Sequence, residues 1–512
     1  MSESRIKKSI INAKVNFAFY FIMLFLSFFS RKIFLETLGP DFMGLSGTLQ
    51  NILQMLSLAE IGIGASISFH LYQPIREGNY NKINELISLF GWFYRIVGSI
   101  ILLGAIIISC FFPLIFANSN LNFTIIYFVF YCFLGSSLIG YFINYRQLLL
   151  TADQRNYVVN IYLQGGQVLK ILLQLFLCIH YCNYFLWAIV EFLFSVFSCI
   201  ILNSKIRQTY PWLKSQPQLG ISLYKKYPTI IRSTKQIFIH RIKDFLLKQS
   251  DQIMIFAFVS LKMVAYYGNY SLLITKVTLL CTSVLDSAAA GVGNLVAEGN
   301  KEKIMKVFWE LMSIRFFAAG LVSVILYFLI PPFITIWLGE EYLLSNLINI
   351  LLCVNTFIMI SRTTTDNFNH AYGQYADVWA AWAEGGINLF ITIITAINWG
   401  IAGILLGKIV SLFFIVILWK PFYLFRDGFQ LHIGLYWKKT FIYYLILICC
   451  IMIIYLLAMI CPIIPTESWS NFIGYSLYIG TIYTLIYFTS MYVFAPGMKD
   501  FIKSILSNIK HK

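Results

Sequence analysis

Charged side chains recur inside the long apolar stretches of this chain, at spacings that place them on single helical faces. Arg241, Asp244, Lys248 and Asp251 follow one another three, four and three residues apart, so a helix over 235–260 presents all four on one side. A charge at bilayer depth is costly when it faces lipid, so it is expected to line an aqueous cavity or to meet an opposite charge. The chemistry that this pattern predicts is the binding of charged groups.

Basic residues modestly outnumber acidic ones at these interior positions, and a net cationic lumen favours an anionic substrate. Arg95 illustrates the pattern, because it shares one helical stripe with Ser88, Gly91 and Gly98. The residues predicted to form the cationic lumen and to contact the substrate are Arg95, Lys170, Arg241, Lys248, Lys276 and Arg362.

Carboxylates at membrane depth are able to bind a proton or Na⁺, or simply to pair with Arg and Lys. Pairing is the favoured role of Asp244 and Asp251, because Arg241 and Lys248 lie one turn away. A structural role is also favoured for Arg315, which is close to a predicted helix end. The carboxylates predicted to couple ions or to pair are Glu60, Asp244, Asp251, Asp286, Asp366 and Glu384.

Composition identifies the elements that must hold these charges. Of 512 residues, 59% are apolar and 12% are charged, whereas soluble domains carry roughly 25% charged residues. A membrane-spanning helix needs ~20 residues, so the chain is predicted to be an all-α polytopic membrane protein. Its apolar runs predict about 14 transmembrane helices, at 12–37, 43–70, 84–116, 122–148, 156–179, 183–204, 235–260, 263–296, 303–338, 343–370, 374–397, 400–425, 437–460 and 469–495.

The distribution of basic residues predicts the orientation. With the N-terminus inside, the inner connections hold nearly all of the Lys and Arg, whereas the outer turns hold Lys262 and the acidic Glu340, Glu341 and Glu467. The positive-inside rule then places both termini in the cytoplasm. The formal net charge of +16 is spread over many inner loops, and no basic domain or nucleic-acid-binding motif accompanies it.

Metal-binding and catalytic patterns are weak. Cys178, His180 and Cys182 form the one cluster of metal-like residue types, in a very short turn with no fourth ligand in view, so no metal site is predicted. A membrane enzyme needs acid–base residues on a sizeable loop or an acidic metal motif, and the predicted outer connections are short. We therefore expect no enzyme and no cofactor, with H⁺ or Na⁺ as the candidate coupling ions.

Two sequence echoes indicate an internal duplication. Glu77-Gly78-Asn79-x-x-Lys82-Ile83 recurs 221 positions later as Glu298-Gly299-Asn300-x-x-Lys303-Ile304, and Gln154 to Ile171 echoes Gln374 to Ile391 at 220 positions. Six predicted helices separate the copies, so both halves enter the membrane in the same direction. The predicted organisation is a first bundle at 1–204, a cytoplasmic linker at 205–234, a second bundle at 235–426, helices 13 and 14 at 427–496 and a basic cytoplasmic tail at 497–512.

The N-terminal region resembles the bacterial polysaccharide flippases of the O-antigen type, in the superfamily that also contains the multidrug (MATE) exporters and the lipid II flippases. The motifs that carry this resemblance are Leu38-Gly39-x-x-x-x-Gly44-Leu45, Leu58-Ala59-Glu60-Ile61-Gly62-Ile63-Gly64-x-x-x-x-Phe69 and Leu71-Tyr72-Gln73-Pro74. They are glycine-rich membrane patterns, which identify a family better than they identify a substrate.

The resemblance implies a MATE-like fold, in which two six-helix bundles surround a cavity that opens alternately to each side. The implied substrate is an undecaprenyl-pyrophosphate-linked oligosaccharide, an O-antigen, capsule or exopolysaccharide repeat unit, that crosses the bacterial cytoplasmic (inner) membrane. A polysaccharide polymerase and a chain-length regulator are the partners expected from this role. Helices 13 and 14 are expected to face lipid beside the substrate's polyprenyl tail, and 497–512 to lie on anionic lipid or in solvent.

Three other functions remain open at this point. A drug exporter of the same superfamily would handle cationic or neutral compounds and would prefer an acidic lumen. A membrane-integral glycan polymerase would need the catalytic loop that this chain lacks. A scaffold protein would not need so many intramembrane charges.

Overall fold

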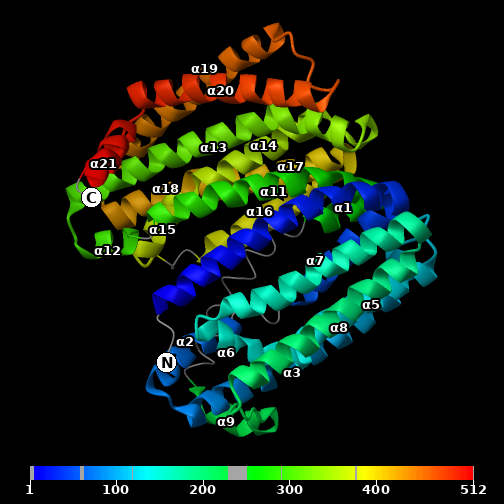
Figure 1. Cartoon of the computed structure of the whole chain (residues 1–512). Coiled ribbons are helices and arrows are strands. Elements are labelled where there is room, and N and C mark those ends of the chain that lie inside the picture. Colours follow the sequence, from blue (N-terminus) through cyan, green and yellow to red (C-terminus); the bar gives the residue numbers. More distant parts are fainter. Residues whose placement is uncertain are drawn as a thin grey trace. The chain divides into compact units, whose positions relative to one another are not determined.

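The computed structural model describes residues 5–57, 63–117, 119–228, 251–289, 291–374 and 378–510. Within those ranges the chain forms helices and the turns between them, and no strand. The chain is therefore an all-α protein, as predicted, and Figure 1 traces its helices in sequence order. They fall into two compact units, Met1–Ala265 and Tyr266–Lys512.

The first unit is built on long, apolar helices that pack in a fixed order. Helix α3 packs on α5, α5 on α8, α8 on α7 and α7 on α1. A Cβ atom at Gly135 would lie 2.7 Å from the ring of Phe192, so this glycine permits the close contact of α5 with α8. The helices are α1 (Arg5–Leu56), α2 (Ile63–Glu77), α3 (Tyr80–Cys110), α4 (Phe112–Ile115), α5 (Phe123–Phe142), α6 (Gln147–Ala152), α7 (Asn156–Tyr181), α8 (Tyr184–Thr209) and α9 (Gly220–Lys226).

Helix α1 contains a break that divides it into two legs. Gly39 has φ 80° and ψ 162°, a backbone conformation that residues with a Cβ rarely adopt. Pro40 follows it and has no N–H to donate to the preceding turn. The Leu38-Gly39 motif therefore marks the boundary between the predicted helices 12–37 and 43–70.

The second unit repeats the packing order of the first. Helix α13 packs on α14, α14 on α17 and α17 on α16, as α3, α5, α8 and α7 do in the first unit. Its helices are α11 (Leu261–Ala289, which starts at the end of the first unit), α12 (Val292–Ala297), α13 (Lys301–Trp337), α14 (Asn346–Ser361), α15 (Thr363–Ala371), α16 (Val378–Trp399), α17 (Ile401–Leu412), α18 (Lys420–Tyr423), α19 (Gly434–Ile460), α20 (Trp469–Phe494) and α21 (Met498–Lys510).

The first sequence echo has the same local structure in both units. Gly78 and Gly299 both adopt positive φ, 66° and 73°. The next residue then caps a long helix: the side chain of Asn79 accepts a hydrogen bond from the Lys82 N–H at 3.0 Å, and that of Asn300 accepts one from the Lys303 N–H at 3.1 Å. This cap satisfies an N–H that has no partner inside the helix, so the motif serves to start α3 and α13.

In the second echo, the equivalent backbone positions differ by one residue from those that the sequence alignment pairs. The left-handed residue that ends α6 is Gln154, with φ 60°, whereas the one that ends α15 is Gly373, with φ 67°. Each turn is closed by the following residue's N–H, from Arg155 to the Leu150 carbonyl and from Gln374 to the Asn369 carbonyl. The backbone turns are thus 219 positions apart, one fewer than the sequence alignment indicates.

Helices α19 and α20 pack on α13 through buried tyrosines. The hydroxyl groups of Tyr483 and Tyr487 donate to the carbonyls of Gly320 and Phe316 at 3.4 and 3.1 Å. A Cβ atom at Gly320 would lie 2.5 Å from the Tyr487 hydroxyl. Helix α20 thus buries one face, while Leu477 and Leu485 on it stay exposed.

Eleven helices in the described ranges are long and apolar enough to cross a membrane, which makes the chain a multi-pass membrane protein. One of them, Ile11–Leu56, includes the break at Gly39 and so covers two of the predicted segments. Helix α11 corresponds to the predicted segment 263–296 but is not among the eleven. The predicted helix 235–260 falls mainly on 229–250, outside the described residues, so the total of 14 stays a prediction.

Candidate functional site

The structure describes only part of the predicted charge set. Glu60, Arg241, Asp244 and Lys248 lie outside the described residues. Asp251 lies in a helical stretch and is buried, with 5% of its surface exposed.

Arg95 lies on an exposed part of α3, and no described carboxylate lies within ion-pairing distance of it. The stripe that was predicted to make this a polar face is instead a packing seam. A Cβ atom at Gly91 would lie 2.7 Å from the Tyr145 ring, and the Ser88 hydroxyl accepts a hydrogen bond from the Gln216 N–H at 2.8 Å. The small residues are thus explained by packing, whereas the exposed guanidinium of Arg95 is not.

Lys170 is neutralised by a residue that the sequence analysis missed. Its Nζ lies 2.6 Å from Oε1 of Glu191 on α8, and both side chains are largely buried. Gln174 donates to the other carboxylate oxygen at 3.3 Å and to the Trp187 carbonyl at 3.0 Å. Glu191 is the only acidic residue within the apolar segment 183–204. The need to balance the charge of Lys170 from a neighbouring helix was therefore the sequence signal by which it could have been found.

Arg362 joins two of the predicted carboxylates. It lies at the junction of α14 and α15, where its Nε donates to Asp366 at 2.8 Å and its Nη1 lies 3.6 Å from Glu384 on α16. The Glu384 side chain is fully buried and that of Arg362 is 12% exposed.

Asp286, one of the carboxylates predicted to couple ions or to pair, forms an ion pair with Arg315. Nη2 of Arg315 on α13 donates to Oδ1 of Asp286 on α11 at 2.6 Å. Arg315 is buried while the Asp286 side chain is 59% exposed, so the two ends of this ion pair differ in their access to solvent. Lys276, on the same helix as Asp286, is half-buried.

A second cluster that sequence reasoning missed ties the start of α1 to the turn between α6 and α7. Lys8 Nζ and Arg155 Nε lie 2.8 and 2.9 Å from the two carboxylate oxygens of Asp153, and the Tyr210 hydroxyl donates to the same carboxylate at 2.8 Å. Burial, together with the charge of Asp153, raises the pKa of Tyr210 well above its ordinary value. The Tyr210 side chain therefore ties the end of α8 to the turn between α6 and α7.

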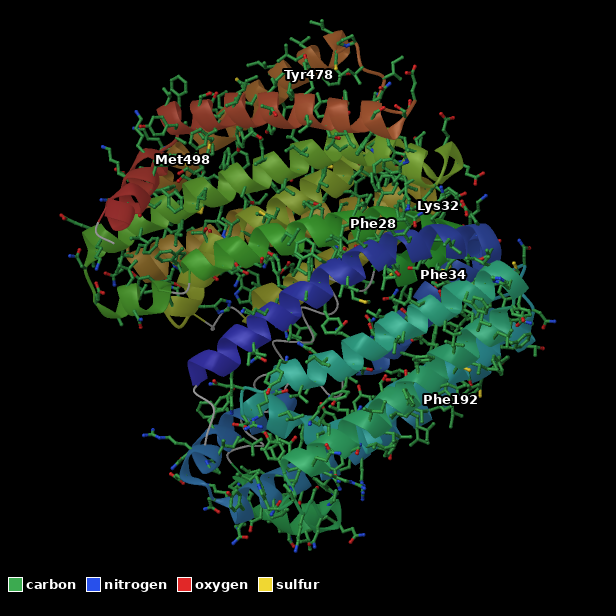
Figure 2. All side chains as sticks on the ribbon, in the orientation of Figure 1. Phe28, Lys32, Phe34, Phe192, Tyr478 and Met498 are labelled. Atoms are coloured by element: carbon green, nitrogen blue, oxygen red, sulfur yellow. The ribbon has the colours of Figure 1, made fainter. Side chains whose placement is uncertain are left out.

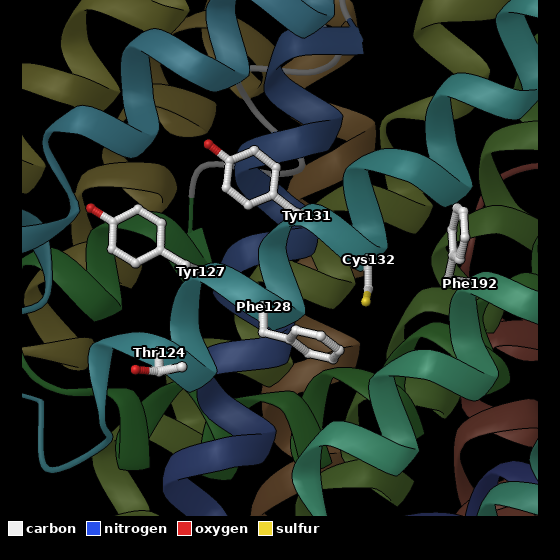
Figure 3. Close-up of a pocket in the computed structure, with 6 residues that line it drawn as sticks. All are labelled: Thr124, Tyr127, Phe128, Tyr131, Cys132 and Phe192. Carbon is white, nitrogen blue, oxygen red and sulfur yellow. The ribbon is translucent and has the colours of Figure 1, made fainter.

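Two apolar pockets lie on the helix surfaces. Figure 3 shows the first, of about 460 Å³, where Phe128 of α5 and Phe192 of α8 flank Cys132. The hydroxyls of Tyr127 and Tyr131 beside it already contact Ser109 of α3 at 3.0 Å. The second pocket, of about 280 Å³, has a wholly apolar lining from Leu273 and Val277 of α11, several residues of α13, and Phe472 of α20.

No group of three His, Cys, Asp or Glu residues that could hold a metal ion occurs in the described part of the chain. Cys178 and Cys182 are free thiols, and the Cys182 thiol donates to the Cys178 carbonyl at 3.2 Å.

Solved structures with this helix arrangement place the chain among known folds. A structure of the lipid II flippase MurJ in an inward closed conformation matches 95% of this chain and 99% of its own, with a TM-score of 0.66 and 16% sequence identity. This chain and that structure share one fold. Two MATE transporters match as well. An inward-facing multidrug resistance transporter of the MOP superfamily matches 80% of this chain and 97% of its own, with a TM-score of 0.53 and 14% identity. A mutant form of VcmN from Vibrio cholerae matches 83% of this chain and 99% of its own, with a TM-score of 0.51 and 15% identity. No protein-family model and no curated protein sequence matches the chain.

Proposed function

We propose that this protein is a flippase that moves undecaprenyl-pyrophosphate-linked oligosaccharide, an O-antigen, capsule or exopolysaccharide repeat unit, across the bacterial cytoplasmic membrane by alternating access. A diphosphate headgroup and its sugars cannot cross hydrocarbon unaided, because each unpaired polar group costs several kcal/mol. A protein that surrounds the headgroup with water and cationic side chains removes that cost, while the polyprenyl tail stays in lipid.

The observation that carries this proposal is the extent of the likeness to the lipid II flippase. That match leaves out only about a twentieth of the chain. The unmatched part is shorter than the segment from α19 to α21, so the match extends into the helices that follow the duplicated bundles. The MATE matches leave out a fifth or a sixth of the chain and have lower TM-scores. A lipid-linked substrate is therefore better supported than a drug.

Arg95 is the cation that we place at the substrate's diphosphate. It is exposed and has no described carboxylate beside it, so its charge is available to an anion. Lys170 and Arg362 belong to the same predicted set, but each is already opposed by a carboxylate in this conformation. Lys276, Arg241 and Lys248 remain proposed contacts.

The apolar pocket between α11, α13 and α20 is a suitable position for part of the polyprenyl tail. Its lining carries no polar surface, and burying a CH₂ group in such surroundings contributes about 0.8 kcal/mol. A tail held along α20 agrees with the absence of Lys, Arg, Asp and Glu from 441–460 and from 469–495.

Reconstituted vesicles provide the direct test. Purified protein in vesicles that contain a fluorescent polyprenyl-diphosphate oligosaccharide should expose that lipid to an outside quencher faster than empty vesicles do. Arg95→Glu should abolish the increase, whereas Arg95→Lys should retain part of it because a point charge suffices for attraction. Full activity of Arg95→Glu at normal protein content would remove Arg95 from the substrate site.

Drug export is the second candidate, because two of the structural matches are MATE transporters. The same vesicles distinguish it. Uptake of a cationic dye by vesicles that do not flip the lipid-linked oligosaccharide would favour export and would contradict the flippase proposal.

Ion coupling, location and partners belong to the same proposal. Asp251, Asp286, Asp366 and Glu384 are the described carboxylates that could take H⁺ or Na⁺. Transport that is unaffected by both the pH gradient and the Na⁺ gradient would exclude that role.

Reporter fusions test the proposed orientation: those after Lys214 and Lys512 should report the cytoplasm, and one at Thr466 should report the outside. A polymerase and a chain-length regulator encoded beside this chain would support the pathway.

A further inference from the structure

The last helix of the chain is docked on the second unit by a tight turn. α20 ends at Phe494 and α21 begins at Met498, and both lie at the end of the unit where α13 and α19 begin (Figures 1 and 2). The backbone of Gly497 is so close to α13 that a Cβ atom would lie 2.3 Å from the Trp309 carbonyl oxygen. The Tyr443 hydroxyl of α19 donates to the Pro496 carbonyl at 2.5 Å, so two helices fix this turn.

Two hydrogen-bond donors near that turn, on Lys439 and Trp309, have no acceptor among the described residues. Lys439 of α19 is half-buried, with its Nζ 4.7 Å from the centre of the Trp309 ring. No carboxylate of the described residues pairs with this ammonium group, and the buried ring N–H of Trp309 has no hydrogen-bond acceptor among them. A half-buried cation that contacts only an aromatic ring is incompletely compensated for its lost hydration, so an anionic oxygen would stabilise it.

The surroundings are basic as well. Exposed lysines occur on the same three helices, namely Lys306 on α13, Lys438 on α19, and Lys499 and Lys503 on α21. The segments 301–310, 434–439 and 498–503 hold seven lysines against the three carboxylates Glu302, Glu310 and Asp500. These segments therefore carry a net positive charge.

Exposed aromatic side chains occur on the same helices. Phe441, three residues after Lys438 and so on the same side of α19, is 65% exposed, and Phe494 at the end of α20 is 66% exposed. A surface that combines an unpaired ammonium group with exposed aromatic side chains matches a ligand that has an anionic head and hydrocarbon chains. A soluble anion would use only the first of these features.

We infer that Lys439 and Trp309, with the lysines of α21 beside them, bind the phosphate of an anionic phospholipid whose acyl chains cover Phe441 and Phe494. The bound lipid would hold α21 against α13 and so stabilise the second unit. This site is separate from the proposed transport site and does not depend on the substrate.

Lipid-dependent melting of the purified full chain tests the inference. Phosphatidylglycerol should raise the melting temperature in detergent, whereas phosphatidylcholine should not. Lys439→Gln should weaken the apparent phosphatidylglycerol affinity about fivefold, the factor that corresponds to about 1 kcal/mol for one basic residue near anionic lipid. Lys439→Arg should keep most of the affinity, which shows that charge and not the fold is what Lys439→Gln removes.

Lys225→Gln is the matched control, because Lys225 is an exposed lysine of α9 in the other unit; it should bind phosphatidylglycerol as the wild type does. An unchanged affinity in Lys439→Gln, or an equal loss in Lys225→Gln, would overturn the site. Equal protection by inorganic phosphate would show that the acyl chains contribute nothing and would overturn the assignment to phospholipid.

Discussion

Removing the charge of one partner of the Lys170–Glu191 pair should destabilise the first unit far more than removing both charges together. The Nζ–Oε1 distance is 2.6 Å, and the side chains are only 13% and 17% exposed. Lys170→Met leaves a buried carboxylate and Glu191→Gln leaves a buried ammonium group. Loss of one partner of a buried ion pair costs about 3–5 kcal/mol, whereas replacement of both by uncharged groups of similar size is often neutral.

The double variant Lys170→Met/Glu191→Gln should therefore melt near the wild-type temperature, and each single variant well below it. Gln174, which donates to Glu191 at 3.3 Å, can still donate to the amide oxygen of a glutamine at 191. Melting temperatures of the four purified proteins in one detergent, followed by the intrinsic fluorescence of tryptophan, give the comparison.

Two results would refute this reasoning. If both single variants melt with the wild type, the pair contributes nothing to stability. If Lys170→Met melts with the wild type but no longer flips the lipid-linked oligosaccharide, Lys170 is a substrate contact and the pair is not its main role.

Three further predictions concern local structure. Asn79→Ala and Asn300→Ala should each cost about 1 kcal/mol, and a loss confined to one of them, measured by thermal melting, would contradict the equivalence of the two helix caps. Gly497→Ala should undock α21 and raise hydrogen exchange over 498–510, because the residue has φ 88° and no room for a Cβ, whereas Gly480→Ala, which meets nothing within 4 Å, should not. The raised pKa of Tyr210 means that its stabilising contribution is complete below about pH 10, the ordinary tyrosine value, and is lost as the pH rises toward its folded value; a wild-type advantage over Tyr210→Phe that persists unchanged above that pH would disprove it.

The sequence predicted the helices because their signals are local. Apolar run length acts within a few residues of the chain, and so do the break at Gly39 and the Gly-Asn caps at 78–79 and 299–300, which the structure adds to the motifs that the sequence analysis singled out. The resemblance to MATE exporters and lipid II flippases agrees with the observed fold for the same reason, since that fold is set by the order and length of these helices.

Side-chain partners were less predictable. Spacing on one helix grouped Arg95 with Ser88, Gly91 and Gly98, but periodicity gives only a face and not what covers it. Tyr145 and Gln216 occupy that seam, and neither is near α3 in sequence. Glu191 and Asp153 were missed for a related reason, because an ion pair between helices depends on which helices are neighbours.

The sequence by itself therefore determined that this protein is an α-helical membrane protein with an internal repeat and an unusual number of buried charges. Those properties follow from the cost of exposing polar backbone and charge to hydrocarbon, which depends on composition and periodicity alone. Only the tertiary structure decided which charges neutralise one another. Lys170 and Arg362 meet carboxylates from other segments, while Arg95 and Lys439 meet none in the described part of the chain. A charge pair requires two side chains to converge within a few ångströms, and that convergence is a property of helix packing.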